Sequence, residues 1–468
     1  MPRNDSKSGR GMPFESFRSR HAAPDQLWRP RLGLLGLFLL MGLTFSSWLA
    51  RIPTVKAELG ISTAELGLVL LAGSVGALAT VAVAGAVVER VGGRAALSAA
   101  AVVGALALVL LGLGPTTGSV AVLTVGVLLN GVAFALANVP QNVETAGVER
   151  RLGRTVIPQF HAAFSVGAVA GSLLGAACAA AGVPLLAQFG VTAVLATVWR
   201  FLTFPVVVHD TRTPSPVPAA AVLPPDDDAR PTRRARLAGS LGAWREPRTL
   251  LVGLVILAAA LSEGSANDWL SLAVVDGFGR TEAVGGVVFG TFVAAMTVVR
   301  IAGTRLIDRY GRVRVLRVSG VVSLAGLLAF GLAPSFPLAV VGVVAWGTGA
   351  ALAVPIGIAA ASDDPLRAAG RVSVVSSFSS LASIAAPPLL GLAAEGIGAR
   401  HALVLITFAM VLSVCLAAQV APLRRGAPAR PTPASLAEAR TGGPTDAADH
   451  PVLPDLVPPA RLPEEVLS

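Results

Sequence analysis

Twelve blocks of apolar residues, each about 20 residues long, constrain this chain more than any other feature of its sequence. A helix of roughly 20 residues crosses the ~30 Å hydrocarbon core of a bilayer. Because lipid offers the backbone no hydrogen-bond partners, each block is predicted to be a helix. Of the 468 residues, 54% are hydrophobic and 14% are charged, whereas soluble domains contain about 25% charged residues. We therefore predict an all-α integral membrane protein with 12 transmembrane helices.

The predicted spans fall into two groups of six. The first group comprises residues 32–50, 66–88, 95–114, 120–139, 160–181 and 185–208. The second group comprises residues 250–272, 284–306, 316–333, 338–361, 372–394 and 402–421. The sequence thus predicts a disordered tail (1–31), a six-helix bundle (32–208), a cytoplasmic linker (209–248), a second six-helix bundle (249–421) and a second disordered tail (422–468).

The positive charges predict the orientation of the spans. The linker and the loops after spans 2, 4, 8 and 10 are rich in arginine, whereas the loops of the other side hold four basic residues, Arg51, Lys56, Arg280 and Arg400. The positive-inside rule then places both termini and the linker in the cytoplasm of a multi-pass inner-membrane protein. Because the basic residues lie between spans, with no basic-aromatic surface, the net charge of +10 does not indicate a nucleic-acid partner.

The two groups of spans carry traces of a duplication. The tetrapeptide at 89–92, Glu-Arg-Val-Gly, ends span 2, and a similar tetrapeptide at 308–311, Asp-Arg-Tyr-Gly, ends span 8. The pair Phe-Ser at 164–165 recurs at 378–379 with nearly the same offset. Parallel repeats of six spans predict two pseudo-symmetric bundles with a solute site near the membrane midplane between them.

The loop after span 2 resembles the motif G-x-x-x-D-R-x-G-R-R of the major facilitator superfamily, and the resemblance covers residues 32–421. Gly93 replaces one arginine of the motif, and Thr304 replaces the glycine of its second copy. This resemblance implies the fold of that family and transport of a small solute by alternating access, with protons as the expected coupling ion and a monomer as the default. The matching residues are Gly85, Glu89, Arg90, Gly92 and Arg94 in the first copy and Asp308, Arg309 and Gly311 in the second.

These motif residues are predicted to form a cytoplasmic gate. Glu89 ends span 2 on the side where span 11 begins, so its carboxylate faces a positive helix terminus. By pseudo-symmetry, Asp308 faces the start of span 5. Such contacts join the halves only when the cytoplasmic side is closed, and each contributes about 0.3–2 kcal/mol. The alternative interpretation is that the arginines only set the topology.

Ionisable residues inside the spans are the candidates for coupling and substrate binding, because each costs at least ~2.5 kcal/mol in the membrane centre. Glu263 in span 7 lies near the midplane and shares a face with Asn267. It is a candidate for proton coupling or for binding a cationic group, with a structural carboxyl as the equal alternative. Asp268 points away and is expected to be structural. Arg300 in span 8 is expected to bind an anion, pair with an acid or belong to the gate. Helical rise places it about 10 Å from Glu263 along the membrane normal.

The first bundle offers a polar series and three further candidates. Asn130, Asn138, Gln141 and His161 fit either a wet path or helix-helix hydrogen bonding. Arg200 is expected to extend toward the cytoplasmic surface. Trp48 and Arg51 are expected to anchor span 1 at the outer interface.

The function predicted from these features is secondary active transport. No P-loop, metal-ligand spacing or H-E-x-x-H motif occurs, so we expect no ATP hydrolysis, no metal, no cofactor and no enzyme activity. The low aromatic content of 5% favours efflux of a small metabolite. The loop at 61–65 and the acid-Asn-Asp-Trp stretch of span 7 loosely resemble the fucose-permease-like branch, which favours the alternative, an uptake symporter. A transport-inactive sensor is the third possibility.

Overall fold

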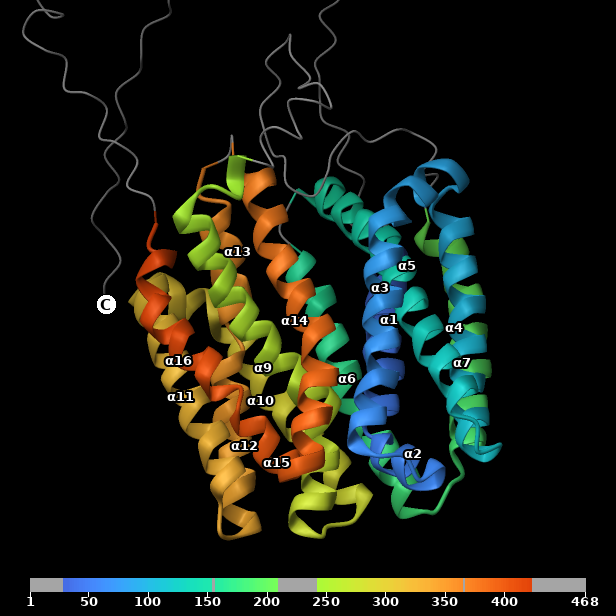
Figure 1. Cartoon of the computed structure of the whole chain (residues 1–468). Coiled ribbons are helices and arrows are strands. Elements are labelled where there is room, and N and C mark those ends of the chain that lie inside the picture. The colour runs from blue at the N-terminus through green and yellow to red at the C-terminus, as the bar shows by residue number, and fades with distance from the viewer. Residues whose placement is uncertain (1–27, 154–155, 209–241, 365–366, 423–468) are drawn as a thin grey trace, which may run out of the picture. The chain divides into compact units, whose positions relative to one another are not determined.

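The computed structural model describes residues 28–153, 156–208, 242–364 and 367–422 (Figure 1). Within these ranges all regular structure is helical, and twelve helices are long and apolar enough to cross a membrane. The all-α fold with twelve spans is therefore confirmed. Most of the predicted linker and tails, at 1–27, 209–241 and 423–468, lies outside the described residues.

The first six spans form one group of helices. Their bounds are α1 (Trp28–Leu49), α2 (Ile52–Leu59), α3 (Thr63–Val91), α4 (Gly93–Thr116), α5 (Val120–Leu152), α6 (Ile157–Ala180) and α7 (Leu185–Val207). A capping box starts α3, because Ser62 and Glu65 each accept a backbone hydrogen bond from the other. The prediction ended the fourth span at 139, but α5 continues to Leu152. The last turns of α5 are polar, so a search for apolar residues does not include them, although they are helical.

The second six spans form the other group. Their bounds are α9 (Pro247–Phe278), α10 (Glu282–Tyr310), α11 (Arg312–Leu332), α12 (Phe336–Ala350), α13 (Ala353–Ala361), α14 (Ala368–Ile397), α15 (Ala399–Val404), α16 (Thr407–Leu416) and the 3₁₀ helix η2 (Ala417–Val420). The tenth span is broken between α12 and α13, at Ala351 and Leu352. Such breaks free backbone carbonyls inside a membrane protein, where only protein or enclosed water can satisfy them.

The two copies of the charged motif make the same turn. Gly92 joins α3 to α4 with φ of +85°, and Gly311 joins α10 to α11 with φ of +77°. Side chains other than glycine are strained at these positive φ values. The positive φ at this turn therefore explains why both copies of the motif have a glycine there.

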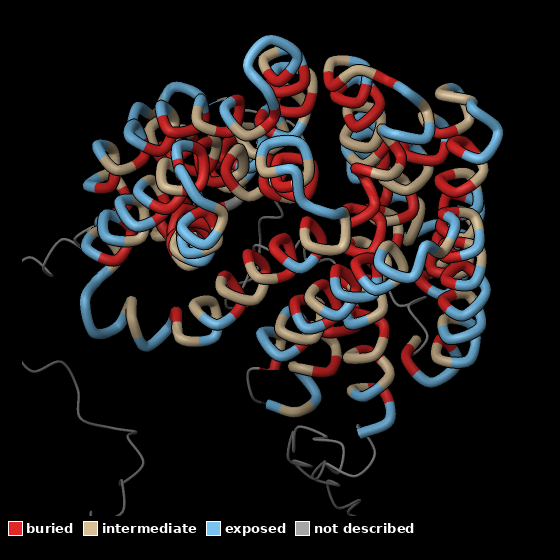
Figure 2. Tube along the Cα trace, turned by 90° about the horizontal axis from the view of Figure 1, so that it is seen from below, coloured by how far each residue is buried: buried red, intermediate tan, exposed pale blue. Residues whose placement is uncertain are grey.

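Apolar side chains cover the outer surface of the helices. Leu202, Ile301 and Phe408 are among the most exposed large hydrophobic residues. Figure 2 shows that the buried parts of the helices lie mostly toward neighbouring helices, whereas the exposed parts lie mostly on the outer side. An apolar exterior on this scale is typical of contact with lipid.

Each group of six forms a bundle, and the bundles meet along two helix pairs, α3 with α14 and α6 with α10 (Figure 1). We call the end where α7 stops and α9 starts the linker end. The end that holds α2 is the distal end.

Candidate functional site

A salt bridge joins the two bundles at the distal end. Arg51 Nε lies 3.5 Å from Glu282 Oε2, and these side chains are only 4% and 15% exposed. The backbone N–H of Thr54 donates to Glu282 Oε1 at 3.0 Å, and the Thr54 hydroxyl also donates to this carboxylate. The expectation that Arg51 and Trp48 anchor the chain at the membrane interface is wrong. Both are buried, and Trp48 packs on Phe189.

Further polar contacts connect the bundles on the distal side. Lys56 Nζ lies 3.3 Å from Asp276 Oδ2. Glu395 accepts hydrogen bonds from the Thr63 hydroxyl at 2.8 Å and from the Ala64 N–H at 3.3 Å. Deeper in the interface, Ser74 Oγ donates to the Ser383 carbonyl at 2.8 Å.

Small residues bring the backbones close at the same end. A Cβ atom on Gly67 of α3 would lie 2.4 Å from the Pro387 carbonyl oxygen of α14, and one on Gly290 of α10 would lie 2.4 Å from Ser172 Oγ of α6. No side chain fits at such distances without movement of the backbone or its neighbour. The structure therefore has a tightly closed distal end, and we call it the distal-closed conformation.

The predicted gate residues do not bridge the bundles in this conformation. Glu89, Arg90, Arg94 and Asp308 are exposed, and within the described residues none of them forms a hydrogen bond or ion pair. Arg309 stacks on its neighbour Tyr310. A Cβ atom on Gly85 would meet nothing within 4 Å. Their role as a gate stays a prediction, since their contacts are expected only when the linker end closes.

Glu263 and Arg300 form an ion pair in the second bundle. Arg300 Nη2 donates to Glu263 Oε2 at 2.7 Å, and Arg300 Nε donates at 3.2 Å to the carbonyl of Ala351, at the break in the tenth span. The side chains are 32% and 26% exposed, so both remain accessible. Pairing with an acid was one of the three roles expected for Arg300, and the structure shows this pair although helical rise predicts a separation of about 10 Å along the membrane normal. Helical rise gives the depth of a Cα atom, but not the tilt of two adjacent helices or the reach of an arginine.

Trp346 of α12 contacts both helices that carry this pair, α9 and α10. Trp346 Nε1 donates to Ser262 Oγ at 2.8 Å and packs edge-on against Phe292. Asn267 and Asp268 are partly buried, and neither makes a hydrogen bond or ion pair within the described residues. His161 on α6 of the first bundle is exposed, and its ring meets Phe38 edge-on.

The polar residues of α5 do not form one continuous ladder. Asn142 Nδ2 donates to Asn138 Oδ1 at 2.8 Å. Gln141 is buried, and its Oε1 has no hydrogen-bond partner within the described residues. Asn130 lies two turns away, beside a separate cavity that also holds Arg200. The expectation that Arg200 extends toward the membrane surface is therefore wrong.

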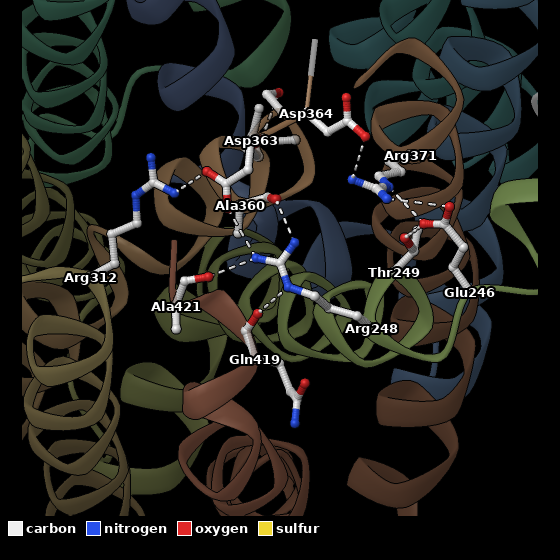
Figure 3. Close-up of polar contacts among 12 residues, drawn as sticks. Glu246, Arg248, Thr249, Arg312, Ala360, Asp363, Asp364, Arg371, Gln419 and Ala421 are labelled. Carbon is white, nitrogen blue, oxygen red and sulfur yellow. Dashed lines mark hydrogen bonds and ion pairs between the residues drawn. The ribbon is translucent and has the colours of Figure 1, made fainter. Parts of the chain in front are cut away.

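A network of charges holds the linker end of the second bundle together, and sequence reasoning missed it (Figure 3). Asp363 binds Arg312 Nη1 at 2.6 Å and Arg248 Nη2 at 3.0 Å. Arg248 also donates to three backbone carbonyls, those of Ala360, Gln419 and Ala421. The sequence signal was available, since acids flank the spans on the same side as the arginines, but those arginines were interpreted only as topology signals.

The second half of this network centres on Glu246, just before α9. Arg371 Nε donates to Glu246 Oε2 at 2.6 Å, and Arg367 Nη1 donates to Glu246 Oε1 at 3.2 Å. Thr249 Oγ1 donates to the same carboxylate at 2.9 Å. The hydrogen bond from Arg371 is the main cause that holds the pKa of Glu246 below its usual value.

Comparison with known proteins agrees with this architecture. Residues 2–155, 34–363 and 252–456 match the family model described as Major Facilitator Superfamily. The chain is 30% identical over 400 residues to the uncharacterized transporter y4wD of Sinorhizobium fredii, covering 85% of this chain and 99% of the relative. Among solved structures, the nucleoside transporter NupG matches with a TM-score of 0.65 at 15% identity, over 83% of this chain and 99% of NupG. The Escherichia coli fucose:proton symporter FucP matches with a TM-score of 0.55 at 13% identity, over 85% and 99%.

Proposed function

The chain belongs to the Major Facilitator Superfamily of membrane transporters, and on that premise we propose that it couples the movement of one small organic anion to that of one proton. The positive-inside rule supports an inner-membrane location with the linker end in the cytoplasm. The distal-closed conformation is then the inward-facing state of an alternating-access cycle.

The Glu263–Arg300 ion pair is the observation that carries this proposal. In the empty carrier the carboxylate and the guanidinium neutralise each other. Protonation of Glu263 releases Arg300, whose guanidinium fork then binds the carboxylate of a solute. The loaded carrier, with a protonated Glu263 and an anion on Arg300, is again neutral.

Charge balance explains why the proton and the anion are expected to cross only together. A carrier with only the proton bound has an additional positive charge in its centre, and a carrier with only the anion bound has an additional negative charge. An uncompensated charge in the membrane interior costs several kcal/mol. Reorientation is therefore expected only for the empty carrier and for the carrier with both ligands.

Proton and anion then move in the same direction. With a more acidic exterior, this mechanism drives uptake. The ion pair thus favours the uptake symporter, whereas the low aromatic content had favoured efflux.

Transport in proteoliposomes tests the proposal. The purified protein is reconstituted, an inwardly directed proton gradient is applied, and radiolabelled carboxylates and neutral solutes are compared. We expect accumulation of one or more carboxylates, accompanied by proton uptake. Glu263→Gln should retain exchange of labelled for unlabelled solute without a gradient, but lose proton-driven accumulation. Arg300→Gln should lose both.

The matched control is Asp268→Asn, which removes a neighbouring carboxyl that has no partner among the described residues. It should retain accumulation. Undiminished accumulation by Glu263→Gln would show that Glu263 does not carry the proton.

A further inference from the structure

A small cavity lies inside the first bundle. Its volume is about 30 Å³, and it is lined by residues of α1, α4, α5 and α7. Two of these residues, Arg200 on α7 and Asn130 on α5, bring hydrogen-bond donors. A space of this size holds about one or two water molecules. The cavity therefore has room for one small group, but not for a whole organic solute.

Neither donor has a partner among the residues that the structure describes. Within the described residues, Arg200 and Asn130 form no hydrogen bond and no ion pair. The third polar residue of the lining, Thr44, donates its hydroxyl to the carbonyls of Leu40 and Met41, so it does not satisfy them. The Arg200 guanidinium and the Asn130 amide therefore line one small space, and no protein group among the described residues accepts their hydrogen bonds.

The surrounding helices offer no counter-charge. The sequences of α1, α4 and α7 contain no aspartate or glutamate. The acids of α5 begin at Glu144, which helical rise places about 21 Å from Asn130. A cation in a membrane protein is ordinarily paired or exposed to water, because an isolated one is costly to bury. The missing negative charge must come from outside the bundle.

The packing of the neighbouring helices leaves space for the Arg200 guanidinium. A Cβ atom on Gly104 of α4 would lie 3.2 Å from Arg200 Nη1, so the glycine leaves the space that the guanidinium uses. On another side of the cavity, Phe45 and Phe134 pack with ring centroids 5.4 Å apart, and both rings also contact Phe164. These rings cover the cavity with apolar surface, which strengthens any charge-charge interaction inside it.

We infer that Arg200 and Asn130 form a binding site for one small monovalent anion, either a halide ion or the carboxylate head of a solute. One negative charge neutralises Arg200, and the cavity volume limits the group to about the size of one or two water molecules. In its halide form the inference is independent of the proposed coupling at Glu263. In its carboxylate form the site binds a carboxylate other than the one that Arg300 takes in the proposed transport cycle, because Arg200 lies inside the first bundle and Arg300 in the second.

Anion-dependent stability of the purified full-length protein tests the site. The Tm is measured in detergent while sodium sulfate is replaced by sodium chloride, or by sodium acetate, at constant ionic strength. Ligands that bind only the folded state raise its stability. We expect the wild-type Tm to rise by about 2–4 °C at saturation in at least one series. A rise with chloride identifies the halide form, and a rise with acetate alone identifies the carboxylate form.

Two variants and one control separate the site from general salt effects. Arg200→Gln and Asn130→Ala should each remove or weaken the anion dependence, and Asn130→Ala keeps the test valid if Arg200→Gln fails to fold. The control Arg305→Gln removes an exposed arginine of α10 and should retain the full dependence. Crystals soaked in bromide should show anomalous density beside the Arg200 guanidinium if a halide binds.

The inference is overturned if the wild-type Tm is the same in sulfate, chloride and acetate. It is also overturned if Arg200→Gln and Asn130→Ala both keep the wild-type response, since the anion would then bind elsewhere. Because this experiment requires no proton gradient, its failure is distinct from failure of the coupling mechanism.

Discussion

Arg51, between α1 and α2, lies 3.5 Å from Glu282, in the first turn of α10, and the pair joins the two halves of the chain. Glu282 also accepts a hydrogen bond from the Thr54 N–H at 3.0 Å. Its carboxylate therefore interacts with three positive or donating groups: the N-terminus of α10, the Arg51 guanidinium and the Thr54 N–H. These contacts connect different bundles, so they stabilise the distal-closed conformation and are lost when the distal ends separate.

Glu282→Gln should shift the equilibrium toward the conformation with an open distal end. The variant removes a largely buried charge pair but keeps a hydrogen-bond acceptor, so the expected effect is about 1–2 kcal/mol, or about a 5–30-fold change in population. Spin labels on the distal ends of the bundles, introduced after Cys178→Ala and Cys415→Ala, report the distance distribution. The control Glu58→Gln changes an exposed acid of α2 and should leave the distribution unchanged. An unchanged distribution in Glu282→Gln would contradict this role.

Gly67→Ala and Gly85→Ala should shift the same equilibrium in opposite directions. An alanine at 67 would place its Cβ 2.4 Å from the Pro387 carbonyl oxygen, so it destabilises the distal-closed state. An alanine at 85 meets nothing within 4 Å in this state, but it would obstruct the close helix packing predicted for a closed linker end. The spin-label distances should therefore lengthen at the distal end in Gly67→Ala and shorten or stay unchanged in Gly85→Ala. Equal effects of the two variants would argue against the gate assigned to Gly85.

For the ionisable residues inside the spans, the sequence predicted which residues matter better than it predicted the contacts that they make. Glu263 and Arg300 were identifiable because a charge within an apolar block is conspicuous whatever the fold. Their pairing remained one of three roles expected for Arg300, because depth along a helix says nothing of tilt or of side-chain reach. The break beside them, at Ala351, had a local signal, since Gly349 and Pro355 flank it, but an unbroken apolar run concealed it.

The partners of charged residues at the ends of spans were the hardest feature to predict from the sequence. Arg248, Arg371 and Asp363 lie where topology rules expect charges, so the sequence offered no reason to pair them. Arg200 was misplaced for a related reason. Near a span end, an arginine that extends to the surface and one that turns inward have the same hydropathy pattern, and the space left by Gly104 on another helix decides between them.

Transport should be electroneutral if one proton accompanies one monovalent anion. The Glu263–Arg300 pair is neutral when empty and neutral when both ligands are bound, so no net charge crosses the membrane with the loaded carrier. The initial rate of proton-driven uptake in proteoliposomes should therefore be the same with and without an imposed potassium diffusion potential. A rate that increases severalfold with an inside-negative potential would require more protons per anion and would contradict the one-to-one scheme.

Glu246→Gln should lower the Tm at neutral pH, and the difference from wild type should shrink in acid. The hydrogen bond from Arg371 lowers the pKa of Glu246 from its usual value of 4.5. A lowered pKa in the folded state means that the stabilisation is fully present above pH 4.5 and is lost as pH falls through the folded-state pKa. Tm values of the variant and wild type measured across this range should converge below pH 4.5. A constant difference down to the lowest pH would mean that ionisation of Glu246 is irrelevant to its role.

Asp363→Asn should destabilise the second bundle more than the loss of an ordinary surface charge. Its side chain is 9% exposed and binds both Arg312 and Arg248, so an amide in its place leaves two arginines without their shared carboxylate. We expect a loss of about 1–3 kcal/mol in the free energy of unfolding, read as a lower Tm. Arg312→Gln should cost part of the same energy, and the double variant should cost less than the sum of the single ones, since all three changes act on one network. The first bundle supplies the control, because Arg94, one residue after the counterpart of Arg312 (Gly93), is exposed without an ion pair among the described residues. Arg94→Gln should leave the Tm within about 1 °C of wild type, and an equal loss in Arg94→Gln and Arg312→Gln would show that Asp363 is not what makes Arg312 important.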